Sequence, residues 1–309
     1  MRCLINNSKT YGMLIVLVYS CFSCLIYAEE QTFTVDSALE GLSNSKNALD
    51  SHDLKIEYIT QWRIYNTDGS RKEDSNIFDR VEAVYARKSS GPNQQCYLEK
   101  KLVRINADNG DITVISDGWA SYDGNATYIL DKNVREGKPK HGFIRVGFDV
   151  NHFQLNSVYK DPYTTIWNQG KTPLGAFIQQ NKKEFQTEQG TDFLESTPSV
   201  KLAGNFADKK LKMKLWVSPQ KNFLPLKRQI YNAQDGRLMS EMVLSNLVQL
   251  SNGMWFPKAI RDGSPDEEWA IHQEVVNISI DPIPEDFFAP EFPEGTQVVD
   301  KVLGLIYEK

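Results

Sequence analysis

The alternation of apolar and polar side chains is clearest in the run Lys210–Val217, where apolar residues occupy every second position and lysines lie between them. A period of two places these two sets on opposite faces of a strand, so this segment predicts a strand with one solvated face. Four further runs follow, separated by residues typical of turns. They are Phe223–Tyr231, Leu238–Leu250, Met254–Ile260 and Trp269–Ile280. Together the five runs predict an antiparallel meander.

Two of these runs carry additional information. In the last one the apolar phase slips from Ile271 and Val275 to Val276 and Ile278. One extra residue near Val275, a β-bulge, accounts for the slip. The run Leu238–Leu250 is apolar on both faces. That pattern suits a strand between an interior hollow and a covering helix, and it suits the core of an ordinary sandwich equally well.

The first half of the chain also predicts mainly strands. The expected runs are Asp53–Asn66, Val81–Arg87, Gln95–Ile105, Ile112–Ile115, Trp119–Tyr122, Ala126–Leu130 and Val200–Phe206. Between them, Ser116–Gly124 is rich in carboxylates, but its two Asp-Gly pairs are typical of hairpin turns, which we prefer to an active site. Residues 131–168 are polar, mixed with aromatics, and show no clear period.

Two helices are expected beside these strands. Ser37 and Glu40 form a capping box, and the apolar positions after them predict a short amphipathic helix that ends near Leu49. Thr172 and Pro173 predict the start of a second helix, with the threonine as N-cap and the proline in the first helical position. Its apolar side consists of Leu174, Phe177, Ile178 and Phe185, and it should end before Gln189.

Length and composition suit one folded, β-rich domain over residues 29–309. The chain has 309 residues, of which 40% are apolar and 24% are charged, and no linker or fixed repeat divides it. The net charge is −5 and there is no basic block, so nucleic-acid binding has no electrostatic basis.

The first 28 residues have the layout of a secretory signal peptide. Arg2 and Lys9 precede an apolar run over Gly12–Tyr27, which ends at Ala28. The run is shorter than the roughly 20 residues of a transmembrane helix. We therefore predict export to a bacterial periplasm. Cys21 offers the alternative of a lipidated, membrane-anchored protein, because the residues before it partly match a lipobox.

Candidate catalytic chemistry is sparse. Cleavage after Ala28 would leave Cys96 as the single cysteine, and its strand-like surroundings predict a small core residue rather than a disulfide or a metal ligand. The four histidines, His52, His141, His152 and His272, are isolated from one another. The chain has no nucleophile elbow, phosphate-binding loop or paired-histidine motif. We expect a protein that is not an enzyme and has no cofactor or metal.

Three stretches resemble the outer-membrane lipoprotein-sorting (LolA-like) superfamily. The first is Ile115–Gly124, which is similar to a hairpin of that family. The second is the strand–turn series that runs from Trp216 through Leu224 and Gly236 to Pro257. The third is the tail Ile283–Asp300, which resembles the family's closing segment of phenylalanine, prolines and Gly-Thr-x-Val.

This resemblance implies a fold and a function. The fold would be a curved antiparallel sheet that forms an unclosed β barrel, with a few helices over its mouth and an apolar hollow for the acyl chains of lipoproteins or lipids. The family's carriers have a functional arginine on an early strand, and Arg87 could supply it as a ligand-binding residue. The chain departs from a minimal carrier in its length and in the polar insertion around residues 131–168. The alternative function is therefore an envelope lipoprotein or sensory domain that binds a protein partner.

Overall fold

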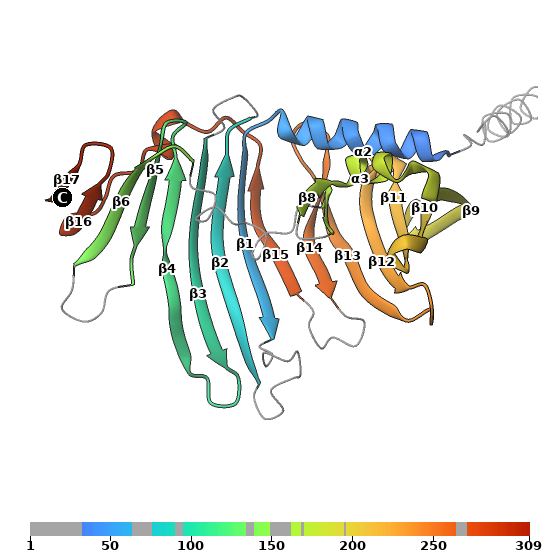
Figure 1. Ribbon diagram of the computed structural model, residues 1–309, viewed down its shortest axis with the longest axis horizontal. Helices are drawn as coiled ribbons and strands as arrows, with labels where there is room; N and C mark the ends of the chain where they lie inside the picture. The colour runs from blue at the N-terminus through green and yellow to red at the C-terminus, as the bar shows by residue number, and fades with distance from the viewer. Residues whose placement is uncertain are drawn as a thin grey trace, which may run out of the picture. The chain divides into compact units, whose positions relative to one another are not determined.

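One large sheet dominates the computed structural model (Figure 1). The structure describes residues 33–63, 76–89, 95–133, 139–148, 162–167, 170–194, 196–263 and 271–309. Within these ranges, fifteen strands form an open sheet in the order β17-β16-β6-β5-β4-β3-β2-β1-β15-β14-β13-β12-β11-β10-β9. The expected fold class, mainly β with an unclosed, largely antiparallel sheet and a few helices, is confirmed.

The strands follow the predicted runs closely. Their bounds are β1 Leu54–Arg63, β2 Ile77–Arg87, β3 Cys96–Asn106, β4 Ile112–Tyr122, β5 Ala126–Asp131, β6 Lys140–Val146, β9 Phe185–Leu194, β10 Thr197–Phe206, β11 Leu211–Ser218, β12 Leu224–Asn232, β13 Leu238–Gln249, β14 Trp255–Gly263, β15 Ile271–Ser279, β16 Thr296–Asp300 and β17 Leu305–Glu308. A separate pair is β7 Thr164–Trp167 with β8 Gly170–Pro173.

The predicted meander is confirmed over β11 to β15, each strand pairing antiparallel with the next. Beyond it, β15 pairs with β1, which joins the two halves of the sheet. The pairing there runs from Glu57 opposite Asn277 to Tyr58 opposite Val275, so Val276 is the extra residue. The β-bulge predicted near Val275 is therefore confirmed.

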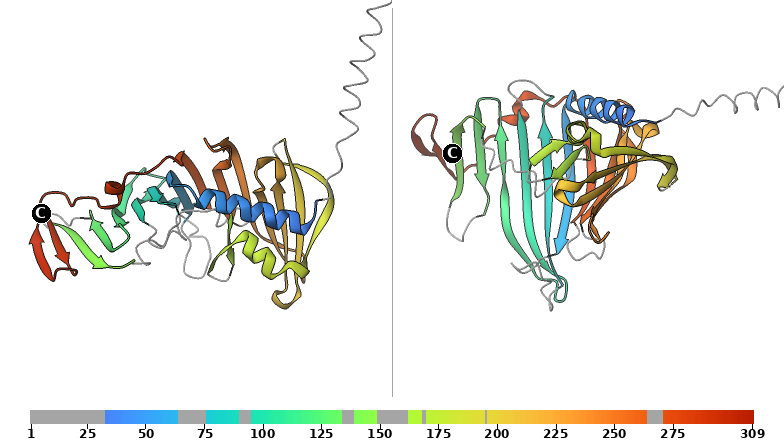
Figure 2. Two further views of the ribbon diagram at one scale, coloured as in Figure 1. Left: turned by 90° about the horizontal axis from the view of Figure 1, so that it is seen from above. Right: turned by 45° about the vertical axis from the view of Figure 1, so that its right-hand side comes forward.

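Two helices cover one face of the sheet on the β9–β15 side. They are α2, Val35–Asp50, and α3, Leu174–Gln180, and they lie together in front of these strands (Figure 2). The rings of Phe177 on α3 and Phe206 on β10 are 5.7 Å apart between centroids, which identifies the covered face. Strand register places Met213 and Leu215 of β11 on this face, and both are buried. We call it the helix-covered face.

In the other half of the sheet, the opposite face carries a second apolar core. The C-terminal segment between β15 and β16 lies over it, and Phe292 stacks on Trp119 of β4 at 5.4 Å between centroids. Leu130 of β5 and Val298 of β16 complete this cluster. Because neighbouring residues of a strand face opposite ways, one sheet can support separate cores on its two sides.

Three expectations from the first half of the chain are wrong in detail. Helix α2 begins at Val35, so Ser37 lies inside its first turn rather than at its N-cap. The expected break between Ile115 and Trp119 is absent, since β4 runs unbroken through Asp117 and Gly118. A Cβ at Gly118 would lie 2.3 Å from the carbonyl oxygen of Leu130, so this glycine allows close approach of β5 rather than a turn.

The second expected helix is also shorter than predicted. It starts at Leu174, whose amide donates to the carbonyl of Tyr163, and Pro173 takes the N-cap position. The helix stops at Gln180, where Asn181 donates its side-chain amide to the carbonyl of Phe177. Phe185, expected on the helix, instead begins β9.

The described part of the polar region 131–168 contributes a strand to the main sheet. Its strand β6 pairs antiparallel with β5 and parallel with β16. The described residues from Val35 to Lys309 group into one compact unit.

Candidate ligand-binding site

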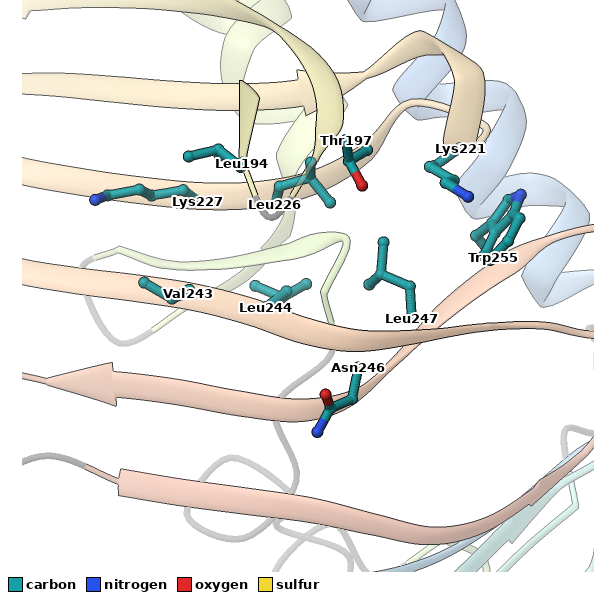
Figure 3. A pocket seen from close by; sticks show the side chains of 10 residues that line it. All are labelled: Leu194, Thr197, Lys221, Leu226, Lys227, Val243, Leu244, Asn246, Leu247 and Trp255. Carbon is teal, nitrogen blue, oxygen red and sulfur yellow. The ribbon is translucent and has the colours of Figure 1, made fainter. Parts of the chain in front are cut away.

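The sheet opens between β12 and β13. Their pairing runs from Tyr231 opposite Leu238 to Lys227 opposite Val243 and goes no further. Beyond that point β12 stays paired with β11, and β13 stays paired with β14. At Asn246 of β13 the backbone φ is 53°, and the pairing with β14 is interrupted there, opposite Lys258, without a change of register. A cavity of about 340 Å³ lies at the opening (Figure 3).

Aliphatic side chains form half of the lining of this cavity, which we call the β12–β13 pocket. They are Leu194, Leu226, Val243, Leu244 and Leu247. Leu226 and Leu244 are also buried in the core. The volume lies at the lower end of the roughly 300–1,000 Å³ of small-molecule sites. An apolar wall that joins the core at an opening of the sheet suits a hydrocarbon chain.

Lys221 and Trp255 form one end of the pocket, which we call its polar end. Lys221 and Trp255 face each other there, with the Lys221 Nζ 3.1 Å from the centroid of the Trp255 ring (Figure 3). The second lysine of the lining, Lys227, extends away from them and pairs with Glu241 at 2.8 Å. Burial raises the pKa of Glu241, but hydrogen bonds from Lys227 and Gln229 outweigh it and leave that pKa below its usual value.

The polar end of the pocket is fixed to helix α2. Lys221 belongs to the one-turn helix η4, Pro219–Lys221, and the next two residues have φ of 56° and 53°. The carbonyl of Asn222 accepts a hydrogen bond from Ser45 of α2. The ring of Phe223 lies against Gly41, where an added Cβ would be 2.1 Å from ring carbon. A shift of α2 would therefore move the loop that carries Lys221.

Arg87, the predicted ligand-binding residue, is the last residue of β2. Its side chain contacts the C-terminal end of α2 and does not line the β12–β13 pocket. Its guanidinium is buried and donates to the carbonyl of Leu49 at 3.0 Å and to that of Asp50 at 3.3 Å. It also pairs with the Asp50 carboxylate at 2.9 Å. A cation at these carbonyls interacts favourably with the helix dipole, so Arg87 holds the end of α2 against the sheet.

The remaining candidate residues that the structure describes do not form a second site. Cys96 is a buried free thiol, as predicted, and burial raises its pKa to about 12. His52 contacts the carbonyl of Ala48 at the end of α2, and His141 and His272 are exposed on different strands. Among the described residues no three histidine, cysteine or carboxylate side chains are grouped for a metal ion. His152, Cys21 and Ala28 lie outside the described residues.

Two further cavities lie side by side on the face opposite α2, sharing Arg80 and Ile59. Each measures about 560 Å³ and has many charged side chains in its lining. Several of these are already paired, such as Arg80 with Glu82 at 2.8 Å and Lys132 with Glu99 at 2.5 Å. They suit an apolar ligand less well than the β12–β13 pocket does.

Sequence reasoning did not identify the β12–β13 pocket. The only signal was the apolar character of both faces of the run Leu238–Leu250. The residues that define its polar end, Lys221 and Trp255, are 34 positions apart and belong to η4 and to the start of β14. The antiparallel order of β12, β13 and β14 places both at the same end of the sheet, across the opening between β12 and β13.

Comparison with known proteins gives similarity of structure at low sequence identity. No family model and no curated protein sequence matches the chain. Similar solved structures include an outer membrane lipoprotein-sorting protein domain from Vibrio parahaemolyticus, with 9% identity over 82% of this chain and 97% of that chain, at a TM-score of 0.39. A DUF1329 family protein from Desulfovibrio piger has 12% identity over 83% and 98%, at a TM-score of 0.40.

A LolA superfamily protein from Nitrosomonas europaea is similar as well, with 13% identity over 83% of this chain and 98% of that chain, at a TM-score of 0.34. The superfamily that the sequence resembles is thus found among the structural neighbours. At these scores the similarity identifies neither ligand nor activity. In the part of the chain that the structure describes, every helix is too short or too polar to cross a membrane.

Proposed function

We propose that the protein is an exported, non-enzymatic carrier that holds acyl chains of lipids or lipoproteins at the β12–β13 pocket. Residues 1–28 direct the chain to the periplasm, and residues 29–309 act as one lipid-binding domain. The observation that carries the proposal is the leucine-rich cavity where β12 and β13 part, because it joins an external opening to the buried core.

The energetics favour such a ligand. Each CH₂ group buried from water contributes roughly 0.8 kcal/mol, so eight buried groups would contribute about 6 kcal/mol before the costs of binding. The cavity itself is small, and α2 with α3 covers the apolar side chains next to it. Strand register places Val243, Leu247 and Trp255 on the face away from these helices. A longer chain that passes between β12 and β13 into the helix-covered core therefore requires the helices to move away from the sheet.

In this proposal Arg87 contributes to ligand binding through the position of α2 rather than by touching the ligand. Its bonds to Leu49 and Asp50 hold the closed arrangement. Weakening these hydrogen bonds should favour the open arrangement, in which α2 has moved away from the sheet. We expect Arg87→Lys to bind acyl chains faster than the native protein while the β12–β13 pocket itself is unchanged.

The test is native mass spectrometry of residues 29–309 purified from a bacterial periplasm, with and without added lipid. Adducts with the mass of a phospholipid or an acylated peptide support the proposal. Leu247→Asp places a charge in the pocket wall and should abolish the adducts, whereas Met239→Asp, at an exposed position of the same strand outside the pocket, should keep them. A clean apo mass after incubation with lipid would refute the carrier function.

A second candidate is the binding of an envelope protein partner. It is favoured by β17, which forms one edge of the sheet and whose four residues are all exposed. Leu305 and Ile306 are 53% and 70% exposed. An open edge with apolar side chains can accept a strand from another chain. Crosslinking in cells through a photoreactive residue at position 306 would test this, and crosslinks only to solvent or lipid would contradict it.

A further inference from the structure

We propose that the β12–β13 pocket selects amphiphiles with an anionic headgroup, with Lys221 as the residue that binds the charge. This inference rests on the proposed function and specifies its ligand. The ligand would carry a carboxylate or phosphate at Lys221 and would place its hydrocarbon chain along Leu247 and Leu226. The shared chemistry is one negative charge at the head of one acyl chain.

The first argument is the separation of polar and apolar groups along the pocket. Lys221 and Trp255 lie at one end, Leu247, Leu226 and Leu244 extend from there past Thr197, and Val243 lies toward the other end with the paired Lys227 (Figure 3). An amphiphile has the same division. A purely apolar ligand would leave the ammonium and the hydroxyl group without a function in binding.

The second argument is the difference between the two lysines of the lining. Lys227 is neutralised by Glu241 at 2.8 Å, and it extends away from the polar end. Within the described residues, Lys221 has no carboxylate at ion-pair distance, and its ammonium instead lies 3.1 Å over the Trp255 ring. A cation–π contact satisfies the charge only partly, so an incoming anion can still gain an ionic hydrogen bond.

The third argument is the rigidity of the loop that carries this lysine. Asn222 and Phe223 are bound to α2 through Ser45 and Gly41. A side chain on a fixed loop loses less freedom on binding than one on a free loop. The same contacts link the headgroup position to the helix that must move when an acyl chain enters.

The experiment compares three ligands that share one oleoyl chain: oleate, oleoyl lysophosphatidic acid and uncharged monoolein. Binding is measured by displacement of a fluorescent fatty-acid probe from native protein and from Lys221→Gln. We expect the substitution to weaken the two anionic ligands by roughly tenfold, the lower end for hydrogen bonds to charged groups. Monoolein should change by less than about twofold. The two anionic ligands together distinguish a carboxylate from a phosphate headgroup.

Lys212→Gln is the matched control, since Lys212 is an exposed lysine on neighbouring β11 and does not line the pocket. It should leave all three affinities unchanged. Lys221→Arg keeps the charge and should keep most of the preference. If all three ligands bind and Lys221→Gln weakens them equally, or not at all, the headgroup inference is wrong and the carrier function stands. If none of them binds the native protein, the carrier function itself fails.

Discussion

Replacing Arg87 by methionine should destabilise the protein by about 3 kcal/mol. The substitution keeps most of the aliphatic packing and removes the guanidinium, which is buried in the native protein. Three sets of contacts are lost, and they contribute unequally to the free energy of unfolding. Their distances and exposure at the C-terminal end of α2 allow each contribution to be estimated.

The bond from Arg87 to the carbonyl of Leu49, at 3.0 Å, is the best formed of the backbone contacts and contributes about 1.5–2 kcal/mol. The bond to the carbonyl of Asp50 is longer, at 3.3 Å, and together with the helix dipole adds about 1 kcal/mol. The Asp50 carboxylate is one-third exposed and keeps Lys46 as a partner. Solvent screening therefore limits the cost of losing the Arg87–Asp50 ion pair to less than about 1 kcal/mol.

Urea denaturation followed by circular dichroism is the assay. With a slope of about 3 kcal/mol per molar urea, the midpoint should fall by about 1 M. Hydrogen exchange of the last turn of α2 should accelerate in Arg87→Met. Arg80→Met, on the same strand but paired with the exposed Glu82, should cost less than about 1 kcal/mol. A loss below about 1 kcal/mol for Arg87→Met, with unchanged exchange in α2, would refute this reasoning.

Three further predictions concern other parts of the fold. Asp53→Asn should destabilise the protein at neutral pH, because the Asp53 carboxylate accepts a hydrogen bond from the amide of Ile283. Burial raises the pKa of Asp53, but its hydrogen bonds and a neighbouring lysine outweigh this effect and lower the pKa. The pKa of Asp53 is lower in the folded protein than its unfolded value near 3.8, so its carboxylate stabilises the fold above that value. This stabilisation is lost as the pH falls through the folded pKa. In urea titrations the difference in stability between Asp53→Asn and the native protein should therefore shrink below about pH 4. Cys96 should react with thiol reagents at pH 8 only after unfolding, because burial raises its pKa to about 12. Gly118→Ala should cost more than about 2 kcal/mol in thermal unfolding, because its Cβ would meet the carbonyl of Leu130 at 2.3 Å.

Each of these predictions has a contrary outcome. A constant gap between Asp53→Asn and native protein from pH 7 to pH 3 would show that the carboxylate's charge is not involved. Rapid labelling of native Cys96 would mean that its strand opens readily. A Gly118→Ala variant of native stability would show that β4 and β5 can separate at no cost. The control is Gly110→Asn, which should be tolerated because Gly110 lies in a turn with a φ of 77° and open space around it.

The strands of this protein were largely determined by the sequence alone. Period-two alternation located β11 to β15, and the phase slip near Val275 located the bulge, because burial on one face of a sheet fixes which residues alternate. The resemblance of three stretches to the LolA-like superfamily, Ile115–Gly124, Trp216–Pro257 and Ile283–Asp300, likewise indicated the fold class. These are local properties, and each is visible within about a dozen neighbouring residues.

Helix ends and glycine roles were less predictable because distant partners decide them. Gly118 resembles a turn glycine in sequence, yet the carbonyl of Leu130 explains it. The second helix ends at Gln180 because Phe185 is needed in β9, where it packs on Phe206 of β10 at 5.5 Å between centroids.

The candidate site was decided by tertiary structure alone. Alternation predicts that β12 and β13 are strands, but it does not predict that their pairing stops at Lys227 and Val243. Lys221 of η4 and Trp255 of β14 meet because the antiparallel meander places both at the same end of the sheet, across this opening. Likewise, the place of Arg87 beneath the end of α2 follows from the packing of a helix across strands far from it in sequence. The alternation of apolar and polar residues along the chain specifies which residues are buried. Contacts between distant segments specify which of these residues line a pocket.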